Sequence, residues 1–417
     1  MPVAVPSFDN DYSAKSFLAD PFPMLEEYRS AGPVTFHTGM NWYMLTGYRD
    51  IAKVLGDAKR FTTHVEMIEA LFGGSVMQTL DNPRHAEFRS IWNDDFRRAY
   101  VENHQQLITR IVDEQLNEFL ASLSANNIAD AVAPMTRVIP TRVIAQLLGV
   151  PEEDTAQFIQ WSDAMGGVTE GPCDLSPRGA EVTAIGLAAT AELNSYMKQA
   201  LEDRRQSPGD DLISRLVVSP VAKTMSEAEQ IASNTQLVFA GNETTTKLMS
   251  LIMIALARHP EQRQLLLEDR SLIPSAIEEI HRFTPVVSFL HRIVRADDVE
   301  IQGVPLPKGS VITCWISAAH RDPSRYENPN ELDVRRASTQ HLGFGIGMRN
   351  CLGQSLSRVE IEIWLNRLLD ELPDWSIPDE IDWGTNYFLR GPVSLPVSTP
   401  ANKSQKLGIR PLRQSAN

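Results

Sequence analysis

The sequence predicts a mainly helical fold with small β-sheets, of the α+β class. Apolar residues recur with helical spacing from about residue 84 to about residue 290. Short strand-like runs lie near the start, in PVTFH and WYMLTG, and again between residues 298 and 318. No internal repeat or linker divides the sequence, so we expect one domain over residues 1–417, with its core at about 20–398 and a polar tail at 399–417.

Charge and cysteine content argue against several classes of protein. The formal net charge of −14 disfavours non-specific binding to nucleic acid or to an anionic membrane. The three cysteines, Cys173, Cys314 and Cys351, form no C-x-x-C pair, so a disulfide framework or a zinc ribbon is not expected. The chain starts without a signal-peptide pattern, and its most apolar segment, 248–257, is shorter than the roughly 18 residues of a membrane span. We therefore expect a soluble, cytoplasmic protein.

One helix is expected to cross the whole molecule. Ser226 and Glu229 have the S-x-x-E spacing of a capping box, and the helical pattern then runs to Arg258, just before Pro260 stops it. Its centre reads FAGNETTTK at 239–247, where a glycine in a helix interior costs about 1 kcal/mol. Threonine hydroxyls can also bond back to the preceding turn and bend the helix. A local rule broken inside a core helix indicates a functional site.

A second candidate site is the stretch HLGFGIGMRNCLGQ at 341–354. Gly343, Gly345 and Gly347 would let the backbone lie flat against a large partner, with which side chains would collide. Cys351 precedes a helical pattern, where the helix dipole and free N–H groups favour a thiolate, so we expect it to ionise readily. The glycine spacing does not fit a dinucleotide-binding loop. A flat partner and a thiolate ligand suggest an iron porphyrin; the alternative is an inert buried cysteine.

The same stretch resembles a known signature. Residues 344–353 fill every fixed position of the pattern F-G-x-G-x-R-x-C-x-G, the haem-ligand signature of the cytochrome P450 monooxygenases. Other segments between about residues 20 and 398 resemble that family in the same order. The resemblance implies the cytochrome P450 fold, shaped like a triangular prism, with haem between the long helix and the cysteine loop. We expect haem b, held non-covalently, because the chain has no C-x-x-C-H motif.

Several side chains are expected to hold the haem. The resemblance makes Cys351 the axial thiolate of the iron and therefore the metal-binding residue. It assigns contacts with the haem or its propionates to His85, Arg89, Ala240, Arg292, Phe344, Arg349 and Gly353. Guanidinium groups suit carboxylates. The alternatives are solvated arginines and, for His85, an ordinary core histidine.

The resemblance also implies a structural network. EEIHR at 278–282 supplies Glu279 and Arg282, one helical turn apart. The segment RDPSRYENPNELDVRR is similar to the family's source of a third member, here Arg336. These three residues are expected to hold the cysteine loop in place without taking part in chemistry. Taken alone, the pair could be an ordinary ion pair on a helix surface.

Oxygen activation is assigned, by the same resemblance, to the centre of the long helix. Ala240, Gly241 and Thr244 fall on one face of it, and the two small residues are expected to leave room for dioxygen. The Thr244 hydroxyl is expected to hydrogen-bond the oxygen and to hold the water that protonates it. Glu243 would relay protons from solvent as a general acid. Many relatives carry aspartate at that position, and the extra methylene of Glu243 could shift the proton path.

The resemblance implies a haem-thiolate monooxygenase, an oxidoreductase that uses dioxygen. One oxygen atom would enter a small, neutral, largely apolar substrate, such as an aryl ether, an alkyl aromatic or a terpenoid, by hydroxylation or O-dealkylation. The chain ends about twenty residues after its last motif, so electrons are expected from separate proteins. These would be a ferredoxin and ferredoxin reductase, or a flavodoxin-type donor, docking on the cysteine side near Arg97 and Arg98.

The substrate pocket is expected to lie beside segments without clear periodicity. Segments 61–80 and 164–178 are predicted to be mobile loops with short helices, and LRGPVSLPV at 389–397 resembles the family's closing hairpin. Segment 61–80 has no lysine or arginine, which favours a neutral substrate. The candidate wall residues are Met67, Leu71, Phe72, Met77, Phe239, Val286, Val287, Phe289 and Phe388.

Three other functions are compatible with these residues. A peroxygenase would take hydrogen peroxide directly and would not need the acid–alcohol pair Glu243–Thr244, which is present. A non-catalytic haem-based gas or redox sensor generally needs an output module, and none is visible in the sequence. A helical scaffold with coincidental motifs would purify without haem.

Overall fold

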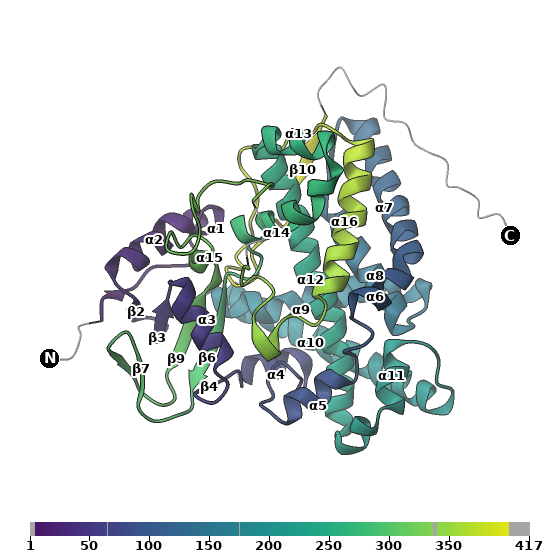
Figure 1. The fold of residues 1–417 in the computed structure, drawn as a ribbon. Coiled ribbons are helices and arrows are strands. Elements are labelled where there is room, and N and C mark those ends of the chain that lie inside the picture. Colours follow the sequence, from purple (N-terminus) through teal and green to yellow (C-terminus); the bar gives the residue numbers. More distant parts are fainter. Residues whose placement is uncertain (1–4, 65, 175, 337–339, 400–417) are drawn as a thin grey trace.

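The computed structural model describes residues 5–64, 66–174, 176–336 and 340–399. Figure 1 shows a mostly helical molecule, with a β-sheet on one side near the N-terminus and the long helices on the other. The predicted class, mainly α with small sheets, is confirmed. Two clusters of buried apolar side chains form the core, one among the helices and one around the sheet. Within the described ranges, no helix combines the length and apolar character needed to cross a membrane.

The main sheet ties the start of the chain to segments far along it. Its strands are β1 (Ser7–Phe8), β2 (Val34–His37), β3 (Trp42–Leu45), β4 (Phe61–Thr62), β6 (Phe289–Val294) and β9 (Val311–Trp315). They lie in the order β1-β2-β3-β9-β6-β4. The strand-like runs near the start form β2 and β3, which are antiparallel, and β3 is parallel to β9, with Met44 opposite Thr313. Two-stranded sheets join β7 (Val299–Ile301) to β8 (Val304–Leu306) and β5 (Ile128–Asp130) to β10 (Pro396–Ser398).

The long helix α12 (Glu227–Arg258) runs through the centre of the molecule, as predicted. Its capping box is formed, because Ser226 and Glu229 each bind the other's main-chain N–H. Its 32 residues span about 48 Å. The other helices are α1 (Lys15–Ala19), α2 (Phe22–Ala31), α3 (Tyr48–Gly56), α4 (Glu66–Phe72), α5 (Arg84–Ser90), α6 (Arg98–Val101), α7 (Gln105–Asn126), α8 (Val138–Leu148), α9 (Thr155–Glu170), α10 (Pro177–Gln206), α11 (Leu212–Val218), α13 (Pro260–Glu268), α14 (Ile273–Phe283), α15 (Ile316–Ala319) and α16 (Gln354–Glu371). Short 3₁₀ or π turns lie at Glu102–His104, Val132–Thr136, Glu152–Asp154, Gly171–Cys173, Pro220–Thr224, Arg270–Leu272 and Gly347–Arg349.

The prediction of a mobile loop at 164–178 is wrong for most of that segment. Helix α9 continues to Glu170, and α10 begins at Pro177. A Cβ atom on Gly167 would lie 2.3 Å from the carbonyl oxygen of Val182 in α10. This glycine therefore permits the close packing of two helices, and it does not mark a turn.

The prediction of a closing hairpin at 389–397 is also wrong. Among the described residues, β10 pairs with β5, and Leu389 forms an isolated bridge with Val287. Pro392 and Pro396 have no N–H group to donate, which limits pairing between the two ends of this segment. The short helix expected within 61–80 is present as α4.

The predicted network of Glu279, Arg282 and Arg336 is assembled in the core. Arg282 Nε and Nη2 donate to the two carboxylate oxygens of Glu279, each at 2.7 Å, and Arg336 Nε donates to Glu279 Oε1 at 3.1 Å. Glu279 and Arg282 are 1% and 0% exposed. A pair this deeply buried is stable only because each charge is fully hydrogen-bonded.

The network reaches the cysteine loop, residues 341–353, through His320. Arg282 Nη1 donates to the carbonyl oxygen of His320 at 2.8 Å, and His320 Nδ1 lies 3.1 Å from the carbonyl oxygen of Arg282. The N–H of Leu342 donates to His320 Nε2 at 2.9 Å. Burial holds the pKa of His320 well below its ordinary value, so the neutral ring donates at Nδ1 and accepts at Nε2. The start of the cysteine loop is thus anchored to the buried ion pair.

A second ionic network, which the sequence did not single out, lies behind the cysteine loop. Glu278 accepts from Arg358 Nε at 2.8 Å and from Nη2 at 2.9 Å, and His341 Nε2 lies 3.1 Å from it. Arg358 also lies over the ring of Phe344, 4.3 Å from its centre. Burial alone would raise the pKa of Glu278, but the hydrogen bonds from Arg358 and His341 outweigh it and hold the pKa well below its ordinary value. The two adjacent glutamates of EEIHR therefore anchor two separate networks.

We predict that Arg282→Lys lowers the free energy of unfolding by about 3–5 kcal/mol, because lysine cannot form the forked contact and leaves Glu279 poorly paired in the core. Chemical denaturation of the full-length protein measures this change. Arg335→Lys is the matched control, since the Arg335 side chain is 61% exposed and a surface ion pair contributes at most about 1 kcal/mol. Equal losses in the two variants would contradict the structural role of Arg282.

We predict that Glu278→Gln lowers the free energy of unfolding by about 2–3 kcal/mol near neutral pH, because it removes charge-assisted hydrogen bonds. The stabilisation by Glu278 is present above the ordinary carboxyl pKa of 4.5 and is lost as the pH falls toward the lower pKa of the folded state. The difference between the two proteins, measured by denaturation at several pH values, should therefore shrink below about pH 4.

Glu300→Gln is the control for this pH series, because Glu300 is exposed on β7. It should differ little from the wild-type protein at any pH. If the difference caused by Glu278→Gln stays constant from neutral to acidic pH, the ionic role of Glu278 is ruled out.

Candidate active site

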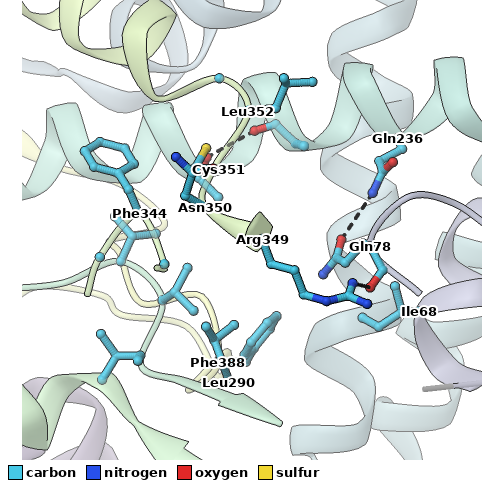
Figure 2. Close-up of a pocket in the computed structure, with 18 of the residues that line it drawn as sticks. Ile68, Gln78, Gln236, Leu290, Phe344, Arg349, Asn350, Cys351, Leu352 and Phe388 are labelled. Carbon is cyan, nitrogen blue, oxygen red and sulfur yellow. Dashed lines mark hydrogen bonds between the residues drawn. The ribbon is translucent and has the colours of Figure 1, made fainter. Parts of the chain in front are cut away.

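A cavity of about 440 Å³ lies between α12 and the cysteine loop. Its walls come from the stretch before α5, the centre of α12, the residues after α14, strand β6, the cysteine loop and the start of α16. Figure 2 shows Cys351 and Phe344 on one side of the open space, and Gln236 and Ile68 on another. The segments that the sequence marked as sites therefore meet at one cavity.

Cys351 borders this cavity just before the first turn of α16. Its side chain is exposed to the cavity but lies deep within the molecule. Burial raises the pKa of the Cys351 thiol above its ordinary value, although the N–H groups of Gly353 and Gln354 and the charges of Arg89 and Arg358 lower it. The expectation that Cys351 ionises readily by itself is therefore wrong, because removal from water outweighs the helix N-terminus. A coordinating metal ion deprotonates a thiol outright, so the thiolate form accompanies metal binding.

The glycines of the cysteine loop are required by the chain itself. Gly345 and Gly347 have φ angles of 71° and 69°, a region that favours glycine. A Cβ atom on Gly343 would lie 2.6 Å from Nε2 of His281. The turn and the His281 ring therefore account for these three glycines, where the sequence suggested collision with a flat partner. Gly353 borders the cavity, and a Cβ atom there would meet no other atom within 4 Å.

The cavity also has basic side chains along its lining: His85, Arg89, Arg292 and Arg349. Arg292 is 7% exposed, and no described carboxylate forms an ion pair with it. Burial lowers the pKa of Arg292 to about 10. A buried cation is unfavourable without an anionic partner, and guanidinium groups pair well with carboxylates. The residues present therefore fit a bound group that carries carboxylates, as the haem propionates would.

Arg89 and Arg349 also hold the cysteine loop. Arg89 donates to the main-chain and side-chain oxygens of Asn350 at 2.7 Å and 2.9 Å. Arg349 Nη2 donates to Asp81 Oδ1 at 3.1 Å. The ring nitrogens of His85 lie 2.7 Å and 3.2 Å from two main-chain carbonyl oxygens. The basic lining and the loop that carries the thiol are thus one connected structure.

Ala240, Gly241 and Thr244 line the cavity from one face of α12, where the sequence placed them. Thr244 Oγ1 donates to the carbonyl oxygen of Ala240 at 3.1 Å, the back-bonding expected for a helical threonine. A Cβ atom on Gly241 would lie 2.9 Å from the side chain of Ile144 in α8. Gly241 therefore allows α8 to approach α12, and because it also lines the cavity, the expectation that it leaves room for dioxygen stays a prediction.

Glu243 lies off that face of α12. It is not among the described residues that line the cavity, and its Oε1 atom is 2.6 Å from Nζ of Lys247. Asp163 of α9 is paired nearby with Arg137 at 3.2 Å. Burial raises the pKa of Asp163 to about 6, with Arg137 opposing the rise and the charge of Glu243 adding to it. Glu243 thus belongs to a cluster of four charged residues where α9 meets α12.

The predicted substrate wall is correct only in part. Five of the expected residues line the cavity: Met77, Val286, Val287, Phe289 and Phe388. Leu71, Phe72 and Phe239 are instead buried in the core, where the rings of Phe72 and Phe239 meet edge to face at 6.0 Å. Phe239 points away because it lies about 100° around α12 from Ala240. The side chain of Met67 lies outside the described residues.

Further side chains that the sequence did not single out complete the wall. Apolar ones are Ile68, Leu237, Leu248, Leu290 and Tyr387. Gln78 and Gln236 are polar, as are Thr63, Thr169, Thr245, His281, His291, Ser357 and Glu360. A signal for Gln236 was available, because it precedes Ala240 by one helical turn and so shares its face of α12.

Comparison with known proteins identifies the family. Residues 33–380 match the family model described as cytochrome P450. The polyketide biosynthesis cytochrome P450 PksS of Bacillus subtilis (strain 168) is 33% identical over 408 residues, covering 92% of this chain and 97% of that protein. The crystal structure of P450BioI in complex with an acyl carrier protein ligated to hexadec-9Z-enoic acid matches with a TM-score of 0.84 at 27% identity, covering 93% and 100%. CYP109E1 from Bacillus megaterium in complex with testosterone matches with a TM-score of 0.82 at 30% identity, covering 92% and 99%.

These matches cover nearly the whole of the described chain and agree with the position of Cys351 at the cavity. The family uses a haem-thiolate cofactor, and the thiol and the basic lining suit such a group. This chain belongs to the cytochrome P450 family and is a haem-dependent monooxygenase.

Proposed function

We propose that this cytochrome P450 inserts one atom of dioxygen into a C–H bond of a small, neutral, largely apolar molecule. The observation that supports this most directly is that one mostly apolar cavity is bordered both by Cys351 and by Thr244. Each dioxygen consumes two electrons and two protons, and its second oxygen atom leaves as water. Hydroxylation and O-dealkylation begin with the same hydrogen abstraction, so both belong to the proposal.

The cofactor we propose is haem b. Cys351 would supply the thiolate ligand of the iron, and Phe344 and Gly353 of the cysteine loop and Ala240 of α12, which line the same cavity, would help to hold the haem. When bound, the haem supplies the iron at which dioxygen is reduced, and the thiolate favours cleavage of the O–O bond. The propionates would be held by His85, Arg89, Arg292 and Arg349.

Thr244 and Glu243 would deliver protons. The Thr244 hydroxyl borders the cavity and can exchange its bond to the Ala240 carbonyl oxygen for one to dioxygen or to a water molecule. Glu243 would bring protons from the side of α12 that faces α9. Its ion pair with Lys247 must open before its carboxyl group can take up and pass on a proton.

A neutral substrate is supported by the distribution of charge around the cavity. The lining arginines are the three assigned to the propionates: Arg89, Arg292 and Arg349. The remaining wall is mostly apolar, and burying apolar substrate surface there contributes about 25 cal/mol per Å². Aryl ethers, alkyl aromatics and terpenoids have this character, as does the testosterone bound by CYP109E1.

Electrons would come from a ferredoxin and its reductase, or from a flavodoxin-type donor. Arg97 and Arg98 lie at the start of α6, which contacts α16, the helix that follows Cys351. Their side chains are 73% and 56% exposed, and they are ion-paired with Asp94 at 2.9 Å and with Glu102 at 2.8 Å. An acidic carrier protein would compete with these carboxylates, so docking should weaken as salt is added.

We predict that the haem-loaded protein, reduced under carbon monoxide, shows the red-shifted absorption band of thiolate-ligated haem, and that Cys351→Ser loses it. A serine hydroxyl does not supply the thiolate that produces the band. Cys314→Ala is the matched control, because Cys314 is buried in β9 and is not part of the described cavity lining. Survival of the band in Cys351→Ser would refute the ligand assignment.

We predict that Thr244→Ala continues to consume NADH but diverts most of it to hydrogen peroxide, because protons no longer reach dioxygen correctly. The assay supplies a ferredoxin, its reductase, NADH and an alkyl aromatic, and measures NADH, peroxide and oxidised product together. Thr244→Ser keeps the hydroxyl and should restore product formation. Thr246→Ala is the control, since Thr246 is buried and bonds Asn242 at 3.0 Å. Unchanged coupling in Thr244→Ala would count against the proton-delivery role.

A further inference from the structure

Two polar side chains face each other in the cavity wall, which also carries the hydroxyl groups of Thr63, Thr169, Thr245 and Ser357 and the carboxyl group of Glu360. Gln236, on α12, and Gln78, in the stretch before α5, both border the cavity. Gln236 Nε2 donates to Gln78 Oε1 at 3.4 Å. Figure 2 shows the two side chains facing each other across from Phe344. We call Gln78 and Gln236 the glutamine pair.

The glutamine pair leaves hydrogen-bonding capacity unused. Gln236 is 5% exposed, and its Oε1 atom has no hydrogen-bond partner among the described residues. The Nε2 group of Gln78 is turned toward the open space in Figure 2. A buried amide oxygen without a partner costs about 1–3 kcal/mol, so native proteins usually satisfy such an atom with water or a ligand.

We propose that the glutamine pair binds a hydroxyl group of the substrate, which is therefore an alcohol or phenol of otherwise apolar character. The hydroxyl would donate to Gln236 Oε1 and accept from Gln78 Nε2. A hydroxyl group both donates and accepts, and the pair offers one acceptor and one donor. If both amides are turned round, the pair again offers one donor and one acceptor. This inference rests on the proposed function, because it assigns a substrate to the same cavity.

Other chemical groups match the glutamine pair less well. An ether or ketone accepts but cannot donate, so Gln236 Oε1 stays unpaired. A carboxylate also only accepts, and it loses its hydration at a wall that offers neutral amides. A hydrocarbon displaces any water from the pair without replacing the hydrogen bonds of that water, which loses affinity.

The position of Gln236 along α12 also limits where oxidation takes place. Gln236 precedes Ala240 by one helical turn and Thr244 by two, which is about 6 Å and about 12 Å along the helix axis. If the substrate is held by its hydroxyl at Gln236, the part of it that faces the haem lies about one helical turn or more from that hydroxyl. The carbon atoms exposed to oxidation would be in that part. The oxidised carbon is therefore several bonds from the carbon that bears the hydroxyl.

The test compares matched compounds binding to the full-length, haem-loaded protein, followed by the low-to-high-spin shift of the haem. One series is para-cyclohexylphenol, its methyl ether and phenylcyclohexane; the other is menthol, menthyl methyl ether and menthane. We expect the hydroxyl compound to bind about 10-fold more tightly than its two analogues in at least one series, which corresponds to about 1.4 kcal/mol.

Variants of the glutamine pair separate binding from structure. Gln236→Met keeps the length of the side chain but removes the amide. It should weaken binding of the hydroxyl compound about 10-fold, while the hydrocarbon still binds. Gln78→Met should reduce the same preference. Gln264→Met, on the exposed side of α13, is the control and should keep it. If the pair has a purely structural role, the two variants should have lower thermal stability and should bind all three compounds more weakly, by the same factor.

The absorption spectrum of each reduced protein under carbon monoxide distinguishes failure of this proposal from failure of the proposed monooxygenase function. Loss of the red-shifted band in the wild-type protein would defeat the proposed function itself. A wild-type protein that shows the band but prefers the hydroxyl compound in neither series would overturn the glutamine-pair proposal alone. Retention of the preference in Gln236→Met, or oxidation at the carbon bearing the hydroxyl, would overturn it as well.

Discussion

The buried ion pair between Glu279 and Arg282 is the constraint from which the active site follows. Both side chains are removed from water, so each charge is stable only while the forked contact is intact. Arg282 also binds the main chain of His320, and the His320 ring binds the main chains of Arg282 and Leu342. Leu342 lies near the start of the cysteine loop, which carries Cys351. A ligand atom works only when the chain behind it is fixed to a fraction of an ångström, and here the ion pair provides that fixed reference.

Helix α12 meets two opposed requirements. Away from the cavity it is a capped, buried helix, while toward the cavity it carries residues that a core helix normally avoids. Packing explains one of them, because Gly241 makes room for Ile144 of α8. Packing does not explain Thr244 and Gln236. No contact among the described residues requires a hydroxyl at Thr244 or a buried amide oxygen at Gln236. Departures from local preference that packing leaves unexplained are therefore the basis on which we propose that Thr244 and Gln236 face a ligand.

The features that could be predicted from the sequence are those that short sequence patterns indicate. The features that could not be predicted depend on residues that are distant in the sequence. A capping box and a cysteine-loop signature each need only nearby residues, so the long helix and the thiol were found. The burial of the E-x-x-R pair was predicted from the family resemblance, because the pair taken alone also fits a helix surface. The role of Gly167 depends on Val182 from the next helix, and the inward packing of Phe72 depends on Phe239. The raised pKa of Cys351 depends on its depth in the whole fold, which no local pattern records.

Charge is distributed unevenly around the cavity, and this bears on how a substrate is selected. Arg292 is a buried cation that no described carboxylate pairs with, so an anion beside it would be stabilised, and we propose that this anion is a carboxylate of the cofactor. By contrast, the glutamine pair, formed by Gln236 of α12 and Gln78 before α5, is neutral. A carboxylate substrate would have to displace the cofactor's own anions or give up its hydration to two amides. A hydroxyl gives up little hydration and regains both hydrogen bonds. If the glutamine pair binds a hydroxyl group as we propose, selection at this wall depends on the number and direction of hydrogen bonds, and the analogues rejected most strongly are those that leave the Gln236 oxygen unpaired.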